Sequence, residues 1–142
     1  MRYVRSSFIG IVMALSIAGS VQGADIGKQQ CPAEISPGDI NIVARPGWKT
    51  HAPYSLPLFG AGMSAGPPES EMTLHGEPLD AKGDSTSYSF GGPDEERWLD
   101  CRYGRSGEFT MSRRLDNGIK QCVITHFKLA PGNPRRVDIR CH

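Results

Sequence analysis

The sequence predicts a mainly β domain, built as a single small antiparallel sheet or a sandwich, with a four-stranded meander at its carboxyl end and two disulfides. Apolar and polar residues alternate through residues 97–141, which is the period of a strand with one buried face. Four cysteines are spread along the chain. No segment repeats apolar residues at helical spacing over the length of a long amphipathic helix. Together these observations favour strands held by covalent cross-links over a helical core.

Residues 1–23 are predicted to be a secretory signal peptide. Two arginines precede the apolar run of residues 8–18, and small residues end the segment. The run is shorter than the about 20 residues that a membrane-spanning helix needs, so no membrane anchor is expected. Residues 24–142 then form a single disulfide-linked β domain of 119 residues, which we expect to be exported to the periplasm or out of the cell.

Export would place the cysteines in an oxidising compartment, where disulfides persist. Cys31, Cys101, Cys122 and Cys141 permit three pairings, and none of them belongs to a C-x-x-C motif. A zinc or redox site is therefore the weaker interpretation. We favour Cys122–Cys141, which would close a short loop between neighbouring strands, and Cys31–Cys101, which would tie the amino-terminal segment to the sheet. Each bridge would contribute about 3 to 4 kcal/mol.

Four strands joined by short turns are predicted in the carboxyl-terminal part. They are expected over residues 97–103, 108–115, 121–129 and 135–141. Asp116-Asn117-Gly118 is a strong hairpin signal, because Asn and Gly accept the positive φ of such turns. A Pro-Gly-Asn-Pro turn follows at residues 131–134. Consecutive hairpins would arrange the four strands as an antiparallel meander.

The amino-terminal half is less regular. Strands are predicted over residues 40–44, 71–79 and 85–90. Residues 53–68 are rich in proline and glycine, so we expect a loop there rather than a helix or a central strand. The apolar side chains of this segment either fold over the core as a lid or protrude as anchors that enter a cleft on another protein.

Charge is unevenly distributed along the chain. Residues 24–96 carry 4 Lys or Arg and 11 Asp or Glu, whereas residues 97–142 carry 10 and 4. One interpretation is that strand charges simply lie on a solvated sheet face. The other is a basic face that docks a charged partner and speeds encounter. Its members would be Arg102, Arg113, Arg114, Arg135, Arg136 and Arg140. Nucleic acid is not an expected partner, because the exported chain has no net basicity.

The stretch GMSAG at residues 62–66 has the G-x-S-x-G form that marks a nucleophilic serine in many hydrolases. That motif functions on a strand-to-helix turn of a larger fold, whereas here two prolines follow Ser64. His75 and Glu77 lie at i and i+2, hence on one face of a strand, which permits metal coordination without specifying it. We therefore predict a protein that is not an enzyme and has no metal or cofactor. A small secreted hydrolase using Ser64 or His75 is a remote alternative.

Five stretches carry a family resemblance: CPAEI at 31–35, PGW at 46–48, WLDCRYG at 98–104, IKQCVITHF at 119–127 and VDIRC at 137–141. With its four cysteines, the chain resembles a family of small exported proteins, some of them encoded in type VI secretion islands of enteric and related bacteria. The resemblance implies a periplasmic immunity protein that blocks the cleft of a peptidoglycan hydrolase. Periplasmic lysozyme inhibitors are a similar class, but their Ser and Lys loops have no counterpart here, which puts lysozyme in doubt as the target.

The leading hypothesis is therefore an immunity or inhibitor protein that binds a secreted or injected cell-wall hydrolase of the amidase or muramidase type. A non-inhibitory accessory envelope protein is the alternative. The protein is expected to be a monomer or a small homo-oligomer. The contact surface is expected in the 59–75 loop or on the charged strand faces, and its candidate residues are Phe59, Met63, Ser64, His75, Glu77, Arg113 and Arg114.

Overall fold

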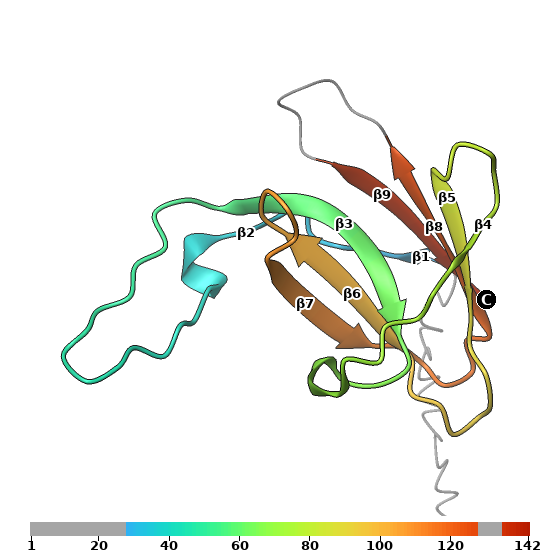
Figure 1. Cartoon of the computed structure of the whole chain (residues 1–142), viewed down its shortest axis with the longest axis horizontal. Helices are drawn as coiled ribbons and strands as arrows, with labels where there is room; N and C mark the ends of the chain where they lie inside the picture. The colour runs from blue at the N-terminus through green and yellow to red at the C-terminus, as the bar shows by residue number, and fades with distance from the viewer. Residues whose placement is uncertain (1–27, 128–134) are drawn as a thin grey trace, which may run out of the picture.

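The computed structural model of the chain describes residues 28–127 and 135–142 (Figure 1). The predicted signal peptide and the predicted Pro-Gly-Asn-Pro turn lie outside the described residues. The described strands form two antiparallel sheets, which confirms the mainly β fold class. The only helical elements of the described part are two 3-10 turns, η1 (Pro37–Asp39) and η2 (Pro68–Ser70).

Both sheets draw strands from distant parts of the chain. The five-stranded sheet has the order β1 (Lys28–Gln29), β9 (Arg136–Cys141), β8 (Gln121–Phe127), β5 (Ser85–Ser89) and β4 (Glu77–Pro78). The four-stranded sheet has the order β2 (Glu34–Ile35), β3 (Leu56–Ser64), β6 (Trp98–Tyr103) and β7 (Phe109–Arg114). The chain therefore passes between the sheets several times, and neither sheet can form from one contiguous segment.

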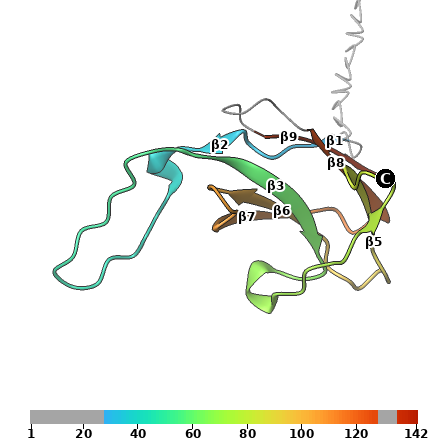
Figure 2. The ribbon, with the colours of Figure 1, turned by 45° about the horizontal axis from the view of Figure 1, so that its top comes forward.

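One hydrophobic core joins the two sheets, whose arrangement is drawn in Figures 1 and 2. Met63, Leu99 and Tyr103 point into it from the four-stranded sheet, and Ile124 and Ile139, which are cross-strand partners, enter from the five-stranded sheet. All five side chains are almost completely buried. Each fully buried side chain of this size stabilises the fold by roughly 1.5 to 3 kcal/mol.

Two disulfides cross-link the fold in the predicted pairing. Cys122 and Cys141 are directly opposite each other on β8 and β9, with their Cα atoms 4.1 Å apart. Cys31 bonds to Cys101 of β6, with a Cα separation of 5.7 Å. Because Cys31 lies between β1 and β2, this second bridge fixes the place where the chain passes from one sheet to the other.

The prediction of a loop over residues 53–68 is wrong, because most of this segment is β3. β3 is the longest described strand and lies between β2 and β6. Its glycines, Gly60 and Gly62, lie on the face opposite to the core residues Ala61 and Met63, where the His126 and Arg102 side chains cover them. The two-residue alternation of a strand is present, but glycine occupies the positions at which polar residues would normally make the alternation recognisable. The prolines fall near the ends of the strand, where fewer ladder hydrogen bonds are lost.

The predicted carboxyl-terminal meander is also wrong, although all four of its strands exist. β6 and β7 pair in one sheet, while β8 and β9 pair in the other. Residues 115–120 cross between the sheets instead of forming a hairpin. Leu115 and Ile119 explain the route, because both are buried in the shared core. Asp116 stabilises the turn by accepting a hydrogen bond from the Gly118 N–H at 2.6 Å.

Residues 41–54, which we call the arm, project away from both sheets (Figures 1 and 2). The strand predicted over residues 40–44 is wrong, since the arm contains no strand. At its tip the Trp48 N–H donates to the Arg45 carbonyl at 2.9 Å, and Gly47 has a φ of 84°. The Thr50 hydroxyl donates to the Ile42 carbonyl at 3.1 Å and joins the outgoing leg to the returning one.

Candidate partner-binding site

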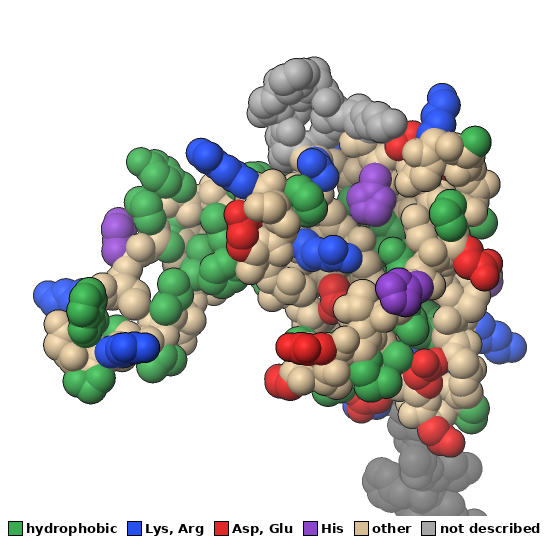
Figure 3. All heavy atoms as spheres, in the orientation of Figure 1, with side chains coloured by type: hydrophobic (Ala, Val, Ile, Leu, Met, Phe, Trp, Pro, Cys, Tyr) green, Lys and Arg blue, Asp and Glu red, His purple; other side chains and the backbone are tan. Residues whose placement is uncertain are grey.

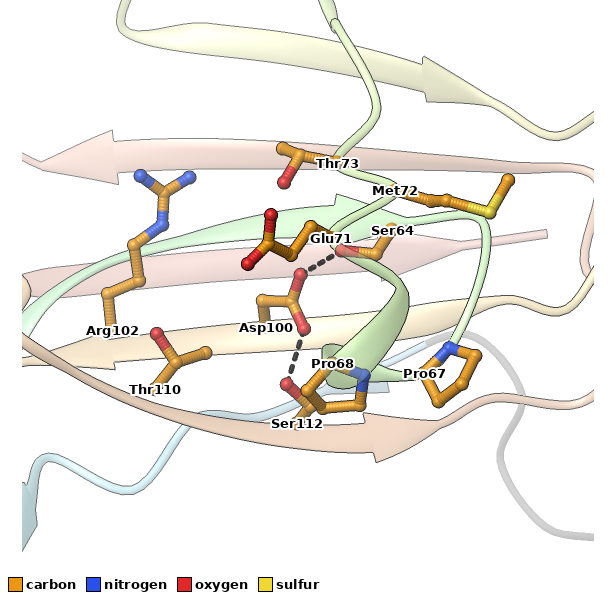
Figure 4. A pocket seen from close by; sticks show the side chains of 10 residues that line it. All are labelled: Ser64, Pro67, Pro68, Glu71, Met72, Thr73, Asp100, Arg102, Thr110 and Ser112. Carbon is orange, nitrogen blue, oxygen red and sulfur yellow. Dashed lines mark hydrogen bonds between the residues drawn. The ribbon is translucent and has the colours of Figure 1, made fainter.

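The outer face of the four-stranded sheet carries a groove of about 310 Å³ (Figure 4). Its floor comes from three neighbouring strands, in which Gly62, Asp100 and Ser112 are consecutive cross-strand partners. One wall is the segment after β3, which includes η2. The lining residues are Ser64, Pro67, Pro68, Glu71, Met72, Thr73, Asp100, Arg102, Thr110 and Ser112. Gly60 and Gly62 on the same face of β3 leave room for the His126 ring and the Arg102 guanidinium to lie over the strand.

Asp100 is the centre of the hydrogen bonding in this groove. Its carboxylate accepts one hydrogen bond from the Ser64 hydroxyl and another, at 2.6 Å, from the Ser112 hydroxyl (Figure 4). The three residues come from β3, β6 and β7, so this bonding ties the strands together. Ser64 is only 6% exposed, and among the described residues it has no histidine partner. The arrangement therefore lacks the base that a serine nucleophile needs.

Arg102 lies across β3 beside this cluster. Its Nη2 atom is 2.8 Å from the position that a Cβ at residue 62 would occupy, so glycine is required at Gly62 for the guanidinium to lie there. The long side chain is exposed and points into the groove (Figure 4). Glu71 lines the same groove, so the surface offers both a cation and a carboxylate. Such groups recognise the polar atoms of another protein.

His126 and Arg135 cover the edge of β3 next to the groove. The Ala61 N–H donates to His126 Nε2 at 3.5 Å, and Arg135 donates to the Phe59 carbonyl at 3.1 Å. Burial lowers the pKa of His126, and Arg102 and Arg135 lower it further. A neutral ring is required here, because Nε2 accepts a hydrogen bond. The two side chains replace a neighbouring strand and protect the unpaired edge.

The first three predicted contact residues belong to β3 and do not protrude. Met63 is fully buried in the core, and Ser64 is nearly so. Phe59 is half-buried, with the Arg135 guanidinium carbon 4.2 Å from its ring centroid. Sequence reasoning missed His126 and Arg135 as the partners of this strand, because their roles depend on contacts with β3 that no local pattern reveals.

The other predicted contact residues are exposed but are not gathered together. Glu77 begins β4, the edge strand of the five-stranded sheet, and His75 lies two residues before it. The described residues contain no group of three or more metal-binding side chains. Arg113 and Arg114 follow each other on β7 and therefore point to opposite faces. The prediction of one basic face is wrong for this pair.

The interactions of the two arginines confirm that they face different surroundings. Arg113 donates to the Gln29 side-chain oxygen on β1, which belongs to the other sheet. Arg114 forms an ion pair with Glu96 at 3.4 Å and is the cross-strand partner of Trp98. The hydrogen bond to Gln29 holds the Arg113 side chain against the protein, and the ion pair with Glu96 does the same for Arg114.

The fold and the groove together describe a small, cross-linked β protein that offers polar and charged groups to a partner. Comparison with known proteins identifies the family: the model of the type VI secretion system Tli immunity protein matches residues 51–142. The chain belongs to this family. The predicted resemblance to type VI immunity proteins is therefore confirmed, and so is the prediction that the protein is not an enzyme.

The matched region begins in the returning leg of the arm and extends through β9. No curated protein and no solved structure matches the chain. Within the described ranges, no helix is long and apolar enough to cross a membrane.

Proposed function

We propose that this immunity protein acts in the periplasm, where it binds and blocks an effector enzyme that degrades peptidoglycan. The observation that carries the proposal is the family match over residues 51–142, because an immunity protein must bind its effector. The signal peptide predicted over residues 1–23 supports the compartment. The two disulfides support it as well, since such bridges persist in oxidising compartments and are rare in the cytosol.

The proposed mode of action is the occlusion of the effector's active site. A cross-linked β body changes little on binding, so little ordering entropy opposes association. The exposed candidates His75, Glu77, Arg113 and Arg114 remain predicted contacts, and because they lie on different surfaces a single interface would include only some of them. Charges at the rim of an interface mainly affect the rate of encounter and its salt dependence.

The test uses residues 24–142 in oxidised form against purified peptidoglycan hydrolases of the amidase and muramidase types. The exported or injected enzyme encoded beside this gene is included in the panel. Stoichiometric inhibition of one wall hydrolase is the expected result. Ser64→Ala should inhibit equally well, because the Ser64 hydroxyl is buried against Asp100.

A parallel assay measures lipid hydrolysis with phospholipid vesicles and secreted lipases as the probes. Inhibition of a lipase, with no effect on any wall hydrolase, would overturn the proposed target while keeping the immunity role. Failure of the folded protein to inhibit any enzyme of either panel would overturn the proposed function in favour of the accessory envelope role.

A further inference from the structure

β7 forms the longest open edge of the two described sheets. The other edge strands, β1, β2 and β4, are each two residues long in the described part of the chain, and β4 contains Pro78. β7 has six residues without proline or lysine, and no described strand pairs with its outer side (Figure 1). Natural proteins keep edge strands short or interrupt them, because an open edge recruits another strand. β7 lacks both forms of protection.

The alternation of the β6–β7 ladder shows which backbone groups of β7 point outward. The Leu115 N–H donates to the Arg97 carbonyl at 2.8 Å and continues this ladder beyond the ends of the two strands. Hydrogen-bonded pairs alternate with non-hydrogen-bonded pairs in antiparallel strands. The N–H and C=O groups of Thr110, Ser112 and Arg114 are therefore directed away from β6, where they can bond to a further strand.

Two apolar side chains of β7 are only partly covered. Phe109 and Met111 are 40% and 42% exposed. Both lie on the core side of the sheet, because their cross-strand partners on β6, Tyr103 and Cys101, are almost completely buried. The apolar core therefore ends along β7, and a strand added beside β7 would cover both side chains.

The sequence of β7 is complementary to itself in one antiparallel register. If Met111 lies opposite the same residue of a second copy, Glu108 lies opposite Arg114 of that copy, and Phe109 lies opposite its Arg113. The first pair joins opposite charges, and Glu108 and Arg114 are both exposed. The second pair places a guanidinium beside an aromatic ring, which is a favourable contact. Two-fold symmetry forms each of these pairs twice.

Neighbouring registers are less favourable. The outward backbone groups must face each other, so one strand can slide past the other only in steps of two residues. A slide that centres the pairing on Ser112 places Glu108 opposite Asp116 of the second copy, and these like charges repel. A slide that centres it on Thr110 moves Arg114 beyond Glu108 and loses the ion pair. Charge therefore selects the register centred on Met111.

We propose that two copies of this protein associate through their β7 strands, which pair antiparallel about Met111 and join the two four-stranded sheets into one. The outward N–H and C=O groups of Thr110 in each copy bond to those of Ser112 in the other. Because this interface is two-fold and uses the same strand of both copies, association stops at the dimer. The inference goes beyond the proposed function, since it concerns the protein before any effector binds.

The pairing also places the two grooves around Asp100 on the same face of the joined sheet. The two-fold axis of an antiparallel strand pair is perpendicular to the sheet, so both copies turn the same face to one side. Thr110 and Ser112 line the groove in each copy and lie on the strands that meet. The dimer therefore presents two equal grooves side by side on one surface.

The first test measures the mass of oxidised residues 24–142 by sedimentation equilibrium over a range of protein concentrations. Glu108→Arg and Arg114→Glu each bring like charges together at both ends of the pairing. Each should raise the dissociation constant of the dimer by about tenfold or more. Arg45→Glu is the matched control, because it reverses an exposed charge on the arm and should leave the dimer unchanged.

An equimolar mixture of Glu108→Arg and Arg114→Glu should form dimers again. In the mixed dimer each copy meets opposite charges at both ends of β7, so the two substitutions compensate each other. A loss of stability within one chain cannot produce this result, and urea unfolding checks that each variant is folded.

The second test removes one outward N–H with Thr110→Pro. Proline is tolerated on the solvent side of an edge strand, so the ladder with β6 should be kept. Thr110→Val is its control, because valine retains the N–H and favours a strand. Thr110→Pro should dissociate the dimer, and Thr110→Val should not.

Three outcomes would overturn the inference. The first is a wild-type protein that has the mass of one chain at every concentration. The second is a dimer that survives both charge reversals and Thr110→Pro, which would place the interface elsewhere. The third is a monomeric wild type whose inhibition of its effector is lost with Thr110→Pro and kept with Thr110→Val, which would assign the edge of β7 to a strand of the effector. Inhibition is measured separately from mass, so each result leaves the proposed function to its own test.

Discussion

Replacing Arg97 with methionine should destabilise the fold strongly, because this arginine holds a crossing between the two sheets. Arg97 is only 3% exposed, although arginine at the start of a strand is normally solvated. Its guanidinium donates to the carbonyl oxygens of Gly92, Glu95 and Ile119. It also lies 5.5 Å from the centroid of the Phe90 ring. The side chain thus joins the segment before β6 to the crossing that leads into β8.

The magnitude follows from the surroundings of the three acceptors. The Ile119 carbonyl belongs to a buried residue, so methionine would leave it unsatisfied at a cost of about 1 to 3 kcal/mol. The carbonyls of Gly92 and Glu95 lie in a more exposed turn and can be hydrated, so each loses about 0.5 to 1.5 kcal/mol. Removing a buried cation returns part of its desolvation cost. The expected loss is therefore about 2 to 4 kcal/mol.

The assay is the urea unfolding of oxidised residues 24–142, monitored by tryptophan fluorescence. Arg114→Met is the matched control, because Arg114 is exposed and its ion pair with Glu96 is expected to contribute about 1 kcal/mol at most. A free energy of unfolding for Arg97→Met that is equal to or higher than that of Arg114→Met would refute this account of the crossing.

Two further predictions concern the cross-link and the edge of β3. Replacing Cys31 and Cys101 with alanine should lower the free energy of unfolding by about 4 kcal/mol, since the bridge spans a sequence separation of 70 residues; a loss below about 1 kcal/mol in urea unfolding would contradict this. Burial, assisted by Arg102 and Arg135, lowers the pKa of His126 from 6.5, so the unfolded chain binds the proton first and stability falls as the pH drops below about 6.5. His126→Gln should therefore flatten the pH dependence of the free energy of unfolding between about pH 7 and pH 5. If the variant shows the same dependence on pH as the wild type, this role of His126 is wrong.

The sequence predicts the elements of this fold better than it predicts their partners. The strands β6, β8 and β9 show their alternation directly, because each has one face in the core, whereas β7 alternates in sequence but is exposed along almost its whole length at the edge of its sheet. The turn at residues 116–118 resembles a hairpin locally, but burial of Leu115 and Ile119 directs the chain to the other sheet. Which sheet the chain enters after this turn depends on a core built from segments that are distant in the sequence, and no local motif carries that information.

β3 illustrates a different limit. The pattern of small outward residues at Gly60 and Gly62 is read as loop composition, yet it allows Arg102 to lie across the strand. The groove around Asp100 could not be predicted for the same reason, since its three hydrogen-bonding partners come from three strands. The disulfide pairing was predictable for two reasons. Cys122 and Cys141 are only 19 residues apart in the sequence, and the remaining pair, Cys31 and Cys101, ties the amino-terminal segment to the sheet.

Residues 41–52 of the arm were missed because their sequence suggests ordinary structure, whereas Tyr54 belongs to the 53–68 segment whose apolar side chains were expected either to cover the core or to act as anchors. INIVA at residues 40–44 has the composition of a strand, but no neighbouring segment pairs with it. A signal was nevertheless present: Trp48 and Tyr54 lie in a proline-interrupted segment that also carries two cations and no acid. Apolar residues that cannot join a strand or a helix are candidates for binding another protein.

The most direct test of the central claim is the survival of bacteria that export the effector encoded beside this gene into their own periplasm. Two forms of the protein are compared, the full chain and a chain that lacks residues 1–23. We predict that the full chain restores growth and that the truncated chain, retained in the cytosol, does not. Equal protection by both forms, or no protection by the full chain when it is shown to be folded and exported, would contradict a periplasmic immunity role.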